Sequence, residues 1–171
     1  AEVKQEGRFS LTGYQFSTYQ KAPTVALSED GQTPKTISAS GGYDGSTVWT
    51  YEGAEGIARL SAGQDLSKKS GSIKFDALRP GTFTAGFVLD FNEAMTDTAT
   101  LTITGVAVED PDGVQGKTYL TVTAAASAPT VQLTAYAAEG RTVSSWSSGS
   151  EAVATVDENG LVTACGIGTA L

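Results

Sequence analysis

The stretch that decides the fold is the last one, Thr142–Leu171, which reads TVSSWSSGSEAVATVDENGLVTACGIGTAL. Apolar residues alternate in Ala152–Val156 and return in Leu161–Ala164, which predicts two short β-strands. The cluster Asp157–Gly160 between them predicts a tight turn, because Asn and Gly tolerate positive φ. Trp146 lies just upstream, on a further short strand. Short strands about a tight turn, next to a tryptophan, predict the centre of a small β-sandwich.

These residues resemble the bacterial Ig-like group 2 domain. Four pieces occur in the family's order and spacing: Trp-Ser-Ser at 146–148, Val-Ala-Thr-Val at 153–156, Gly-Leu-Val at 160–162 and Gly-Thr-Ala at 168–170. The resemblance covers about the last third of the chain and implies such a domain over residues 117–171. It implies a fold and not a chemistry, because sandwiches of this kind host many unrelated roles. The family pattern continues with one more strand, so we expect this copy to lack its last strand.

Residues 23–105 read as a divergent relative of the same unit. Short β-branched and apolar runs separated by Gly, Asp and Pro turn signals are typical of a seven-strand sandwich. The expected strands are 24–28, 35–40, 47–51, 57–61, 72–77, 82–91 and 98–104. Landmarks of this half, including Trp49, recur in the same order about ninety residues later, with a longer loop at 62–70 in the first copy. Residues 92–97 read as a turn.

The stretch 106–116, VAVEDPDGVQG, reads as the linker between the two sandwiches, because Asp-Pro and Asp-Gly favour turns. Thr118–Ala124 and Thr130–Ala137 then supply the opening strands of the second sandwich. We therefore predict an all-β chain of two tandem Ig-like β-sandwiches, preceded by an extended N-terminal segment at 1–22.

That N-terminal segment alternates apolar and polar residues on both sides of Gly13. One interpretation is a strand of a neighbouring domain. The other is an arm that pairs with another subunit, with Phe9, Leu11, Tyr14 and Phe16 as the interface candidates. Such an arm could fill the place of the missing last strand by strand addition. The plainer explanation for the missing last strand is that the given sequence stops before the end of the domain. A start at Ala1 fits either removal of a signal peptide or trimming of an initiator Met.

Composition excludes several classes of function. The 171 residues carry a net charge of −8 with a pI near 4.4, so they offer no basic stripe for nucleic acid or an anionic bilayer. No apolar run is long enough to span a membrane. Cys165 is the single cysteine, so no disulfide forms within the chain, and we expect it to pack in its strand as a small hydrophobe.

The sequence lacks most of the residue arrangements that enzyme active sites use. The chain has no His, which removes the usual general base, the Ser-His triad and most zinc sites. Its adjacent carboxylates fall in expected turns, where they cannot converge across a cleft as glycoside hydrolysis needs. We predict no enzyme activity and no cofactor. Glu109, Asp110 and Asp112 are candidate Ca²⁺ ligands, but the motif is shorter than an EF-hand loop, which favours a plain acidic turn.

The aromatic residues offer a second kind of site. Trp49 and Trp146 could stack on sugars, but both occupy the position at which a sandwich buries a core tryptophan, so core packing is the favoured reading. Tyr43 and Tyr51, near Gly-rich loops, are candidates for surface contacts.

The resemblance implies a non-enzymatic structural or adhesive module outside a bacterial cell or on a virion. It would act as a spacer, an assembly subunit or a weak surface-binding domain. Its partners would be other copies, neighbouring domains, or glycans or proteins of a host or cell surface. One alternative is a phage tail or capsid decoration protein that assembles through its N-terminal arm. Another is an accessory domain of a secreted carbohydrate-active enzyme. The residues leave the ligand and the oligomeric state open.

Overall fold

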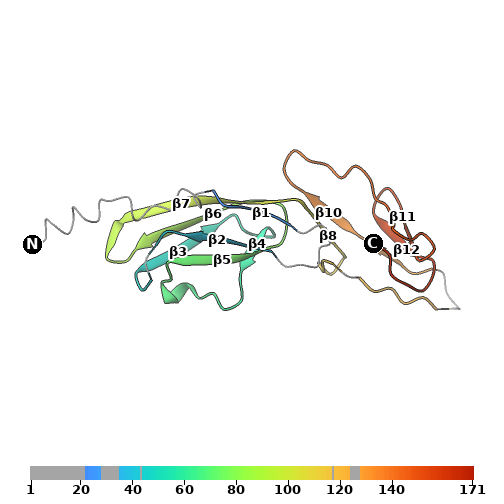
Figure 1. Cartoon of the computed structure of the whole chain (residues 1–171), viewed down its shortest axis with the longest axis horizontal. Coiled ribbons are helices and arrows are strands. Elements are labelled where there is room, and N and C mark those ends of the chain that lie inside the picture. The colour runs from blue at the N-terminus through green and yellow to red at the C-terminus, as the bar shows by residue number, and fades with distance from the viewer. Residues whose placement is uncertain (1–21, 28–34, 43, 117, 124–127) are drawn as a thin grey trace, which may run out of the picture. The chain divides into compact units, whose positions relative to one another are not determined.

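A computed structural model of the chain describes residues 22–27, 35–42, 44–116, 118–123 and 128–171 (Figure 1). These residues form twelve β-strands and one short 3₁₀ helix, which confirms the predicted all-β class. The chain divides into two compact units. Unit 1 holds the described residues up to Thr104, and unit 2 holds those from Gly105 onward.

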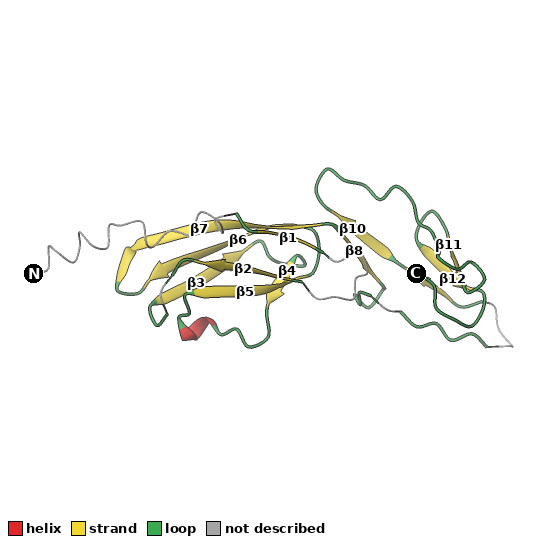
Figure 2. Cartoon of the chain, viewed as in Figure 1, coloured by secondary structure: helices red, strands yellow, loops and turns green. Residues whose placement is uncertain are grey.

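Unit 1 is a two-sheet sandwich with the strand order of an immunoglobulin fold (Figure 2). Its strands are β1 (Thr24–Ala26), β2 (Thr36–Ser40), β3 (Thr47–Glu52), β4 (Ala58–Leu60), β5 (Ser72–Ala77), β6 (Gly81–Leu89) and β7 (Asn92–Thr104). One sheet has the order β1-β7-β6-β3 and the other β2-β5-β4. The orders β3-β6-β7 and β2-β5-β4 are those of strands C-F-G and B-E-D in Ig domains. Only β1 pairs in parallel, with β7, while every other pair in this unit is antiparallel.

The core of unit 1 lies between these sheets, because side chains of period two bury one face of each strand. Phe75 on β5 is fully buried, with its ring centroid 4.9 Å from that of Phe83 on the facing sheet. Trp49 on β3 is 4% exposed and meets Phe87 edge to face at 5.5 Å. Burying one such aromatic side chain is worth about 1.5–3 kcal/mol. The core position predicted for Trp49 is therefore confirmed.

Unit 2 has two small sheets, ordered β10-β8 and β11-β12-β9. Its strands are β8 (Val106–Glu109), β9 (Thr130–Gln132), β10 (Thr134–Ala137), β11 (Ala154–Val156) and β12 (Leu161–Ala164). The run expected as one strand over 130–137 is split between the two sheets. Leu133 marks the switch, and its N–H donates to the carbonyl of Gly160 at 3.0 Å.

The predicted hairpin of the last stretch is present. The side chain of Asp157 holds its turn, since Oδ1 accepts the N–H groups of Asn159 at 2.9 Å and Leu161 at 2.8 Å. Gly160 has φ +82°. A Cβ at this position would lie 2.9 Å from both the carbonyl oxygen of Leu133 and the indole of Trp146. Glycine is thus required here by the backbone conformation and by the close approach of two neighbours.

The structure differs from the expected linker. Val106–Glu109 is a strand that pairs with β10 inside unit 2, and only the residues after it form a turn. The alternation of Val-Ala-Val-Glu is that of a half-buried strand, with Ala107 and Glu109 buried and the two valines exposed. The Asp-Pro and Asp-Gly pairs that follow favour turns, so the expected start of the second domain is residue 117, whereas unit 2 begins at Gly105.

Other strand expectations also change. Residues 92–97 belong to β7, because β6 continues its pairing as far as Leu89 and the turn lies at 90–91. Residues 118–123 form no strand despite their β-branched content. Trp146 lies in a loop, since no neighbouring backbone ladder reaches residues 141–148.

Candidate functional site

Several candidate residues lie outside the described part of the chain. They are Phe9, Leu11, Tyr14 and Phe16 of the N-terminal segment, and Tyr43. Their proposed roles in contacts with other copies or surfaces stay predictions.

Two of the three candidate Ca²⁺ ligands, Glu109 and Asp110, use their carboxylates in protein contacts, and Asp112 contributes its backbone N–H. Asp110 Oδ1 accepts the N–H groups of Asp112 at 3.0 Å and Val114 at 2.9 Å, so it caps the turn after β8. Glu109 is 6% exposed, and its Oε1 accepts from Gln115 Nε2 at 2.9 Å. Within the described ranges, no group of three His, Cys, Asp or Glu residues is placed to hold a metal ion. The stretch is an acidic turn stabilised by its own carboxylates.

The remaining candidate residues differ in how far their side chains are exposed to solvent. Trp146 is half-buried, with its ring against Gly160, and so belongs to the packing of unit 2 even though it lies on no strand. Tyr51 is 39% exposed at the end of β3, with its ring edge on Phe75. The expected burial of Cys165 is wrong, because β12 ends at Ala164 and the thiol is exposed.

The loop 61–71, which joins β4 to β5, has a defined local structure. Within it lies a 3₁₀ helix, η2 (Leu66–Lys68), which Asp65 caps by accepting the Ser67 N–H at 2.9 Å and its hydroxyl at 2.6 Å. These two hydrogen bonds, the hydroxyl first, hold the pKa of Asp65 below its usual value of 3.8. The helix ends at Lys68, and its C-cap residue Lys69 adopts the left-handed conformation with φ +50°.

Hydrogen bonds to three other strands or turns hold this loop against unit 1. The Trp49 indole N–H donates to the carbonyl of Ser70 at 2.5 Å, and the Gly71 N–H donates to Asp44 Oδ1 at 2.6 Å. Lys69 Nζ lies 2.6 Å from Asp90 Oδ2 in an ion pair. A loop fixed at several points presents its side chains in one arrangement, as a binding site requires.

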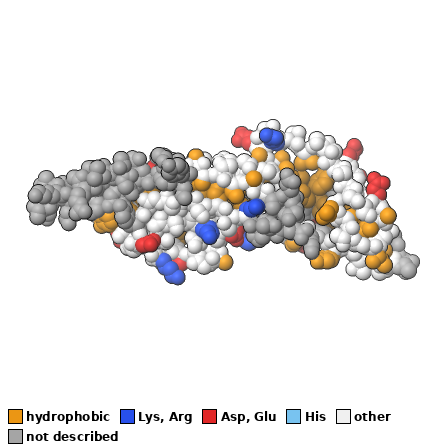
Figure 3. All heavy atoms as spheres, viewed as in Figure 1, with side chains coloured by type: hydrophobic (Ala, Val, Ile, Leu, Met, Phe, Trp, Pro, Cys, Tyr) orange, Lys and Arg blue, Asp and Glu red, His pale blue; other side chains and the backbone are white. Residues whose placement is uncertain are grey.

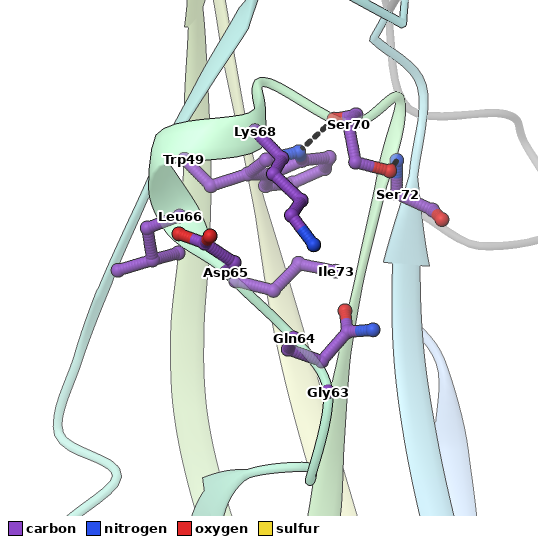
Figure 4. A pocket seen from close by; sticks show the side chains of 9 residues that line it. All are labelled: Trp49, Gly63, Gln64, Asp65, Leu66, Lys68, Ser70, Ser72 and Ile73. Atoms are coloured by element: carbon purple, nitrogen blue, oxygen red, sulfur yellow. Dashed lines mark hydrogen bonds between the residues drawn. The ribbon is translucent and has the colours of Figure 1, made fainter.

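A cavity of about 140 Å³ opens between this loop and β5 (Figure 4). Its lining residues are Trp49, Gly63, Gln64, Asp65, Leu66, Lys68, Ser70, Ser72 and Ile73. Figure 4 shows the Lys68 side chain running across the cavity in front of the indole, with Ile73 directed into the space below it. Ile73 and Trp49 are core residues, 2% and 4% exposed, whereas Leu66 is 39% exposed. The remaining side chains of the lining are mostly polar.

The sequence predicts that this loop is longer than its counterpart in the second half, and no site is expected in it. The usable signal was the polar run Gln64-Asp65-Leu66-Ser67-Lys68-Lys69-Ser70 in a loop that the second half of the chain lacks. Long loops within compact domains are commonly functional. Which of these side chains converge depends on η2 and on the hydrogen bond from Trp49, and neither is visible in the sequence.

On the face shown in Figure 3, Lys and Arg side chains form no large basic patch. Two basic side chains of unit 1 are in ion pairs, Arg59 with Asp76 and Lys69 with Asp90. Across the described ranges, no helix is both long enough and apolar enough to cross a membrane.

Comparisons with known proteins give little. No family model matches the chain, and no curated protein matches it. Among solved structures, it is similar to a crystal structure of a C-terminal 282-residue fragment of intimin in complex with the intimin-binding domain of the translocated intimin receptor. The TM-score is 0.30 and the identity 20%, over 81% of this chain and 52% of that one. The chain thus spans about half the length of that fragment, and nothing about function is inferred from a likeness this low.

Proposed function

We propose that this chain is a non-enzymatic spacer and adhesive module, made of Ig-like units in series on the exterior of a bacterial cell or a virion. The observation that supports it is the pairing of β1 with β7, the first and last strands of unit 1. They are neighbours and run parallel, in the register Thr24 with Thr102 to Ala26 with Thr104.

This pairing suits a module that bears tension. When the two ends of unit 1 are pulled apart, adjacent parallel strands slide along each other, so all their hydrogen bonds are loaded together. Two of these bonds run from the Thr102 N–H to the carbonyl of Pro23 and from the Leu27 N–H to the carbonyl of Thr104, both at 3.0 Å. The interior also favours a rigid body, because every buried side-chain nitrogen and oxygen in the described residues has a hydrogen-bond partner.

Force spectroscopy of the full chain, held at its two ends, tests the spacer role. Pro23 and Leu27 both bond to β7, so Val25 between them directs its N–H to β7 and Ala26 directs its own away. Val25→Pro removes a ladder donor and should lower the unfolding force of unit 1. Ala26→Pro is the matched control and should leave it nearly unchanged. Equal forces for both variants and the unmodified chain would contradict the proposal.

We also propose that unit 2 belongs to the bacterial Ig-like group 2 family. Support comes from the way its sequence pieces meet in space. Gly160 of the Gly-Leu-Val piece lies against Trp146 of the Trp-Ser-Ser piece. A Cβ at Gly168, in the Gly-Thr-Ala piece, would lie 2.8 Å from Val153 Cγ2. Glycines that permit close contacts between pieces explain why the pattern keeps them at these spacings.

Cell surface and virion are two settings for the same module, and the native particle mass distinguishes them. Light scattering coupled to gel filtration should give a monomer near 17.5 kDa for a spacer. A discrete oligomer lost on deletion of residues 1–22 would instead support a virion subunit that assembles through its N-terminal arm.

A further inference from the structure

One sheet of unit 2 repeats one sheet of unit 1 in strand order and in register. The order β11-β12-β9 corresponds to β4-β5-β2, and all the strand pairs in both sheets are antiparallel. Ala154 lies opposite Ala164 in unit 2, as Ala58 lies opposite Ala77 in unit 1. Residues of this sheet in unit 2 can therefore be matched one by one to residues of unit 1.

The turn that leaves this sheet is also the same in both units. The carbonyl of Ile57 accepts two N–H groups of the turn in unit 1, and the carbonyl of Val153 accepts two in unit 2, at 2.8 to 3.1 Å. A Cβ at Gly81 would lie 2.7 Å from the Ile57 side chain, and one at Gly168 would lie 2.8 Å from that of Val153. Gly168 therefore matches Gly81, the first residue of β6.

Residues 169–171 follow the course that β6 takes after its first residue. The carbonyl of Leu171 accepts the N–H of Gly149 at 2.6 Å, which joins it to the segment that carries Trp146. In unit 1, β6 pairs with β3, the strand that carries Trp49. Residues 169–171 are thus the start of a strand that corresponds to β6.

Two segments of unit 2 lack the strand partners that their counterparts have in unit 1. Residues 142–148 match β3, which pairs only with β6, and residues 118–123 stand as far ahead of β9 as β1 stands ahead of β2. In unit 1, β1 pairs only with β7. Neither segment of unit 2 forms a strand, and no backbone–backbone hydrogen bond joins either one to another described segment (Figure 2). A missing pair of strands accounts for both.

The matching face of the sheet is apolar and only partly covered. Val162 stands in the place of the fully buried Phe75, and it is half-buried together with Val131 opposite it. On the two flanking segments, Tyr119 is 85% exposed and Val143 is 41% exposed. In unit 1, β6 and β7 cover this face with buried apolar side chains at alternate positions, which are Phe83, Ala85, Phe87, Leu89, Ala99, Leu101 and Ile103. A hairpin with the same alternation fits unit 2.

We propose that unit 2 is an acceptor for a two-stranded β-hairpin attached to it at Leu171. The first strand of the hairpin continues from residues 169–171, pairs antiparallel with residues 142–148 and covers Trp146. The second strand pairs in parallel with residues 118–123. Unit 2 thus takes up two strands, whereas the sequence pattern led us to expect one.

Attachment at Leu171 favours this occupant over a second copy of the chain. A tethered segment has an effective concentration in the mM range, so it fills the place before a separate molecule does. The inference goes beyond the proposed spacer role, which rests on unit 1. With the hairpin in place, unit 2 would have the same parallel pair of first and last strands that β1 and β7 form in unit 1.

Hydrogen exchange of two proteins tests the proposal. One is the full chain, and the other is the full chain extended after Leu171 by a copy of residues 85–104, because Thr84 matches Leu171. In the full chain, the amides of 118–123 and 142–148 should exchange much faster than those of β12. In the extended chain, both segments should exchange about ten-fold more slowly or less, while unit 1 stays unchanged.

A matched control carries Phe87→Ser and Leu101→Ser in the copied segment only. These changes keep the length of the extension and remove two of its inward apolar side chains, so neither segment should gain protection. Equal protection by both extensions would overturn the proposal, because it would show that the apolar face does not select the hairpin.

Two further results would overturn it. One is slow exchange of 118–123 or 142–148 in the full chain, because the place would then already be filled; light scattering shows whether a second copy fills it. The other is the absence of protection in the extended chain. Unit 2 can fail this test while unit 1 still passes the force measurement, so the two proposals fail separately.

Discussion

Unit 1 and unit 2 have the same kinds of local sequence signal, alternating strands and tight turns, but they differ in how completely their sheets enclose a hydrophobic core. In unit 1, fifteen hydrophobic residues form one buried core between two facing sheets. Among the described residues of unit 2, the buried hydrophobic side chains are those of Ala107 and Ala164. Alternating strands and tight turns thus produce strands in both units. A closed core needs two sheets long enough to cover each other, and unit 2 has strands of three or four residues.

The consequence for unit 2 is apolar exposure. Val106 is 50% exposed, Val143 41% and Val108 36%. Hydrophobic side chains also show between the polar atoms on the surface in Figure 3. Because hydrophobic stabilisation scales with the apolar area removed from water, unit 2 should be the less stable of the two.

The largest expected effect on the free energy of unfolding is that of Phe75→Ala in unit 1. Removing a fully buried phenylalanine should cost about 3–5 kcal/mol of the free energy of unfolding. The matched change in unit 2, Val162→Ala, removes a half-buried side chain and should cost about 1 kcal/mol. Urea unfolding followed by the fluorescence of Trp49 or Trp146, with the other tryptophan replaced by Phe, measures each unit. Equal losses would show that unit 2 is as well packed as unit 1.

The next effect concerns crowding inside unit 2. Gly160→Ala forces a Cβ against the Leu133 carbonyl and the Trp146 ring at φ +82°, and should cost about 2 kcal/mol or more. Gly140→Ala is the control, because its φ is +74° and a Cβ there meets nothing within 4 Å. It should cost only the strain of the left-handed backbone, about 1 kcal/mol. The fluorescence of Trp146 should change in the first variant alone.

A smaller effect is expected from the turn of the hairpin. Asp157→Ala removes an acceptor for two backbone N–H groups and should cost about 1 kcal/mol in unit 2. Asp157→Asn keeps a side-chain oxygen in the same place and should cost less. Urea midpoints of the two variants give the comparison, and a larger loss for Asn than for Ala would refute the role of this oxygen.

The smallest effect is a pH dependence in unit 1. The Ser61 hydroxyl, at 2.7 Å, lowers the pKa of Asp76 below 3.8, and Arg59 at 3.1 Å adds to this against the opposing effect of burial. A pKa lowered on folding stabilises the folded state above the ordinary value of 3.8. That contribution is lost as the pH falls through the folded-state pKa.

Asp76→Asn provides the measurement. The urea midpoint of unit 1 should be lower in this variant than in the unmodified chain at pH 6, and the gap should narrow at pH 3. A gap that is constant from pH 6 to pH 3 would mean that ionisation of Asp76 does not contribute.

Much of the local structure was predictable. The turn at 157–160 followed from the φ tolerance of Asn and Gly, and the burial of Trp49 from its place in an alternating strand. β5 was predicted with its exact bounds, because Ser72–Ala77 alternates cleanly between turn signals. Where turn-forming residues stood inside a ladder, as at 92–97, pairing with β6 overrode them.

The candidate site was not predictable to the same degree. The sequence marked the loop 62–70 as an addition to the first half, yet the convergence of Lys68, Gln64 and Ser72 requires η2 and β5 to lie beside each other. The exposure of Cys165 was also missed, since it depends on where β12 ends and not on the apolar character of the residue.

By itself, the sequence determined the all-β class, the hairpin of the last stretch and the strand-forming segments of unit 1, because these depend on period-two patterns and turn residues close together in the chain. Only the tertiary structure decided which strands are neighbours. The parallel pairing of β1 with β7, the switch of sheets at Leu133 and the cavity beside Trp49 all join residues far apart in sequence. Such contacts depend on the packing of whole sheets, whose free energy no local pattern contains.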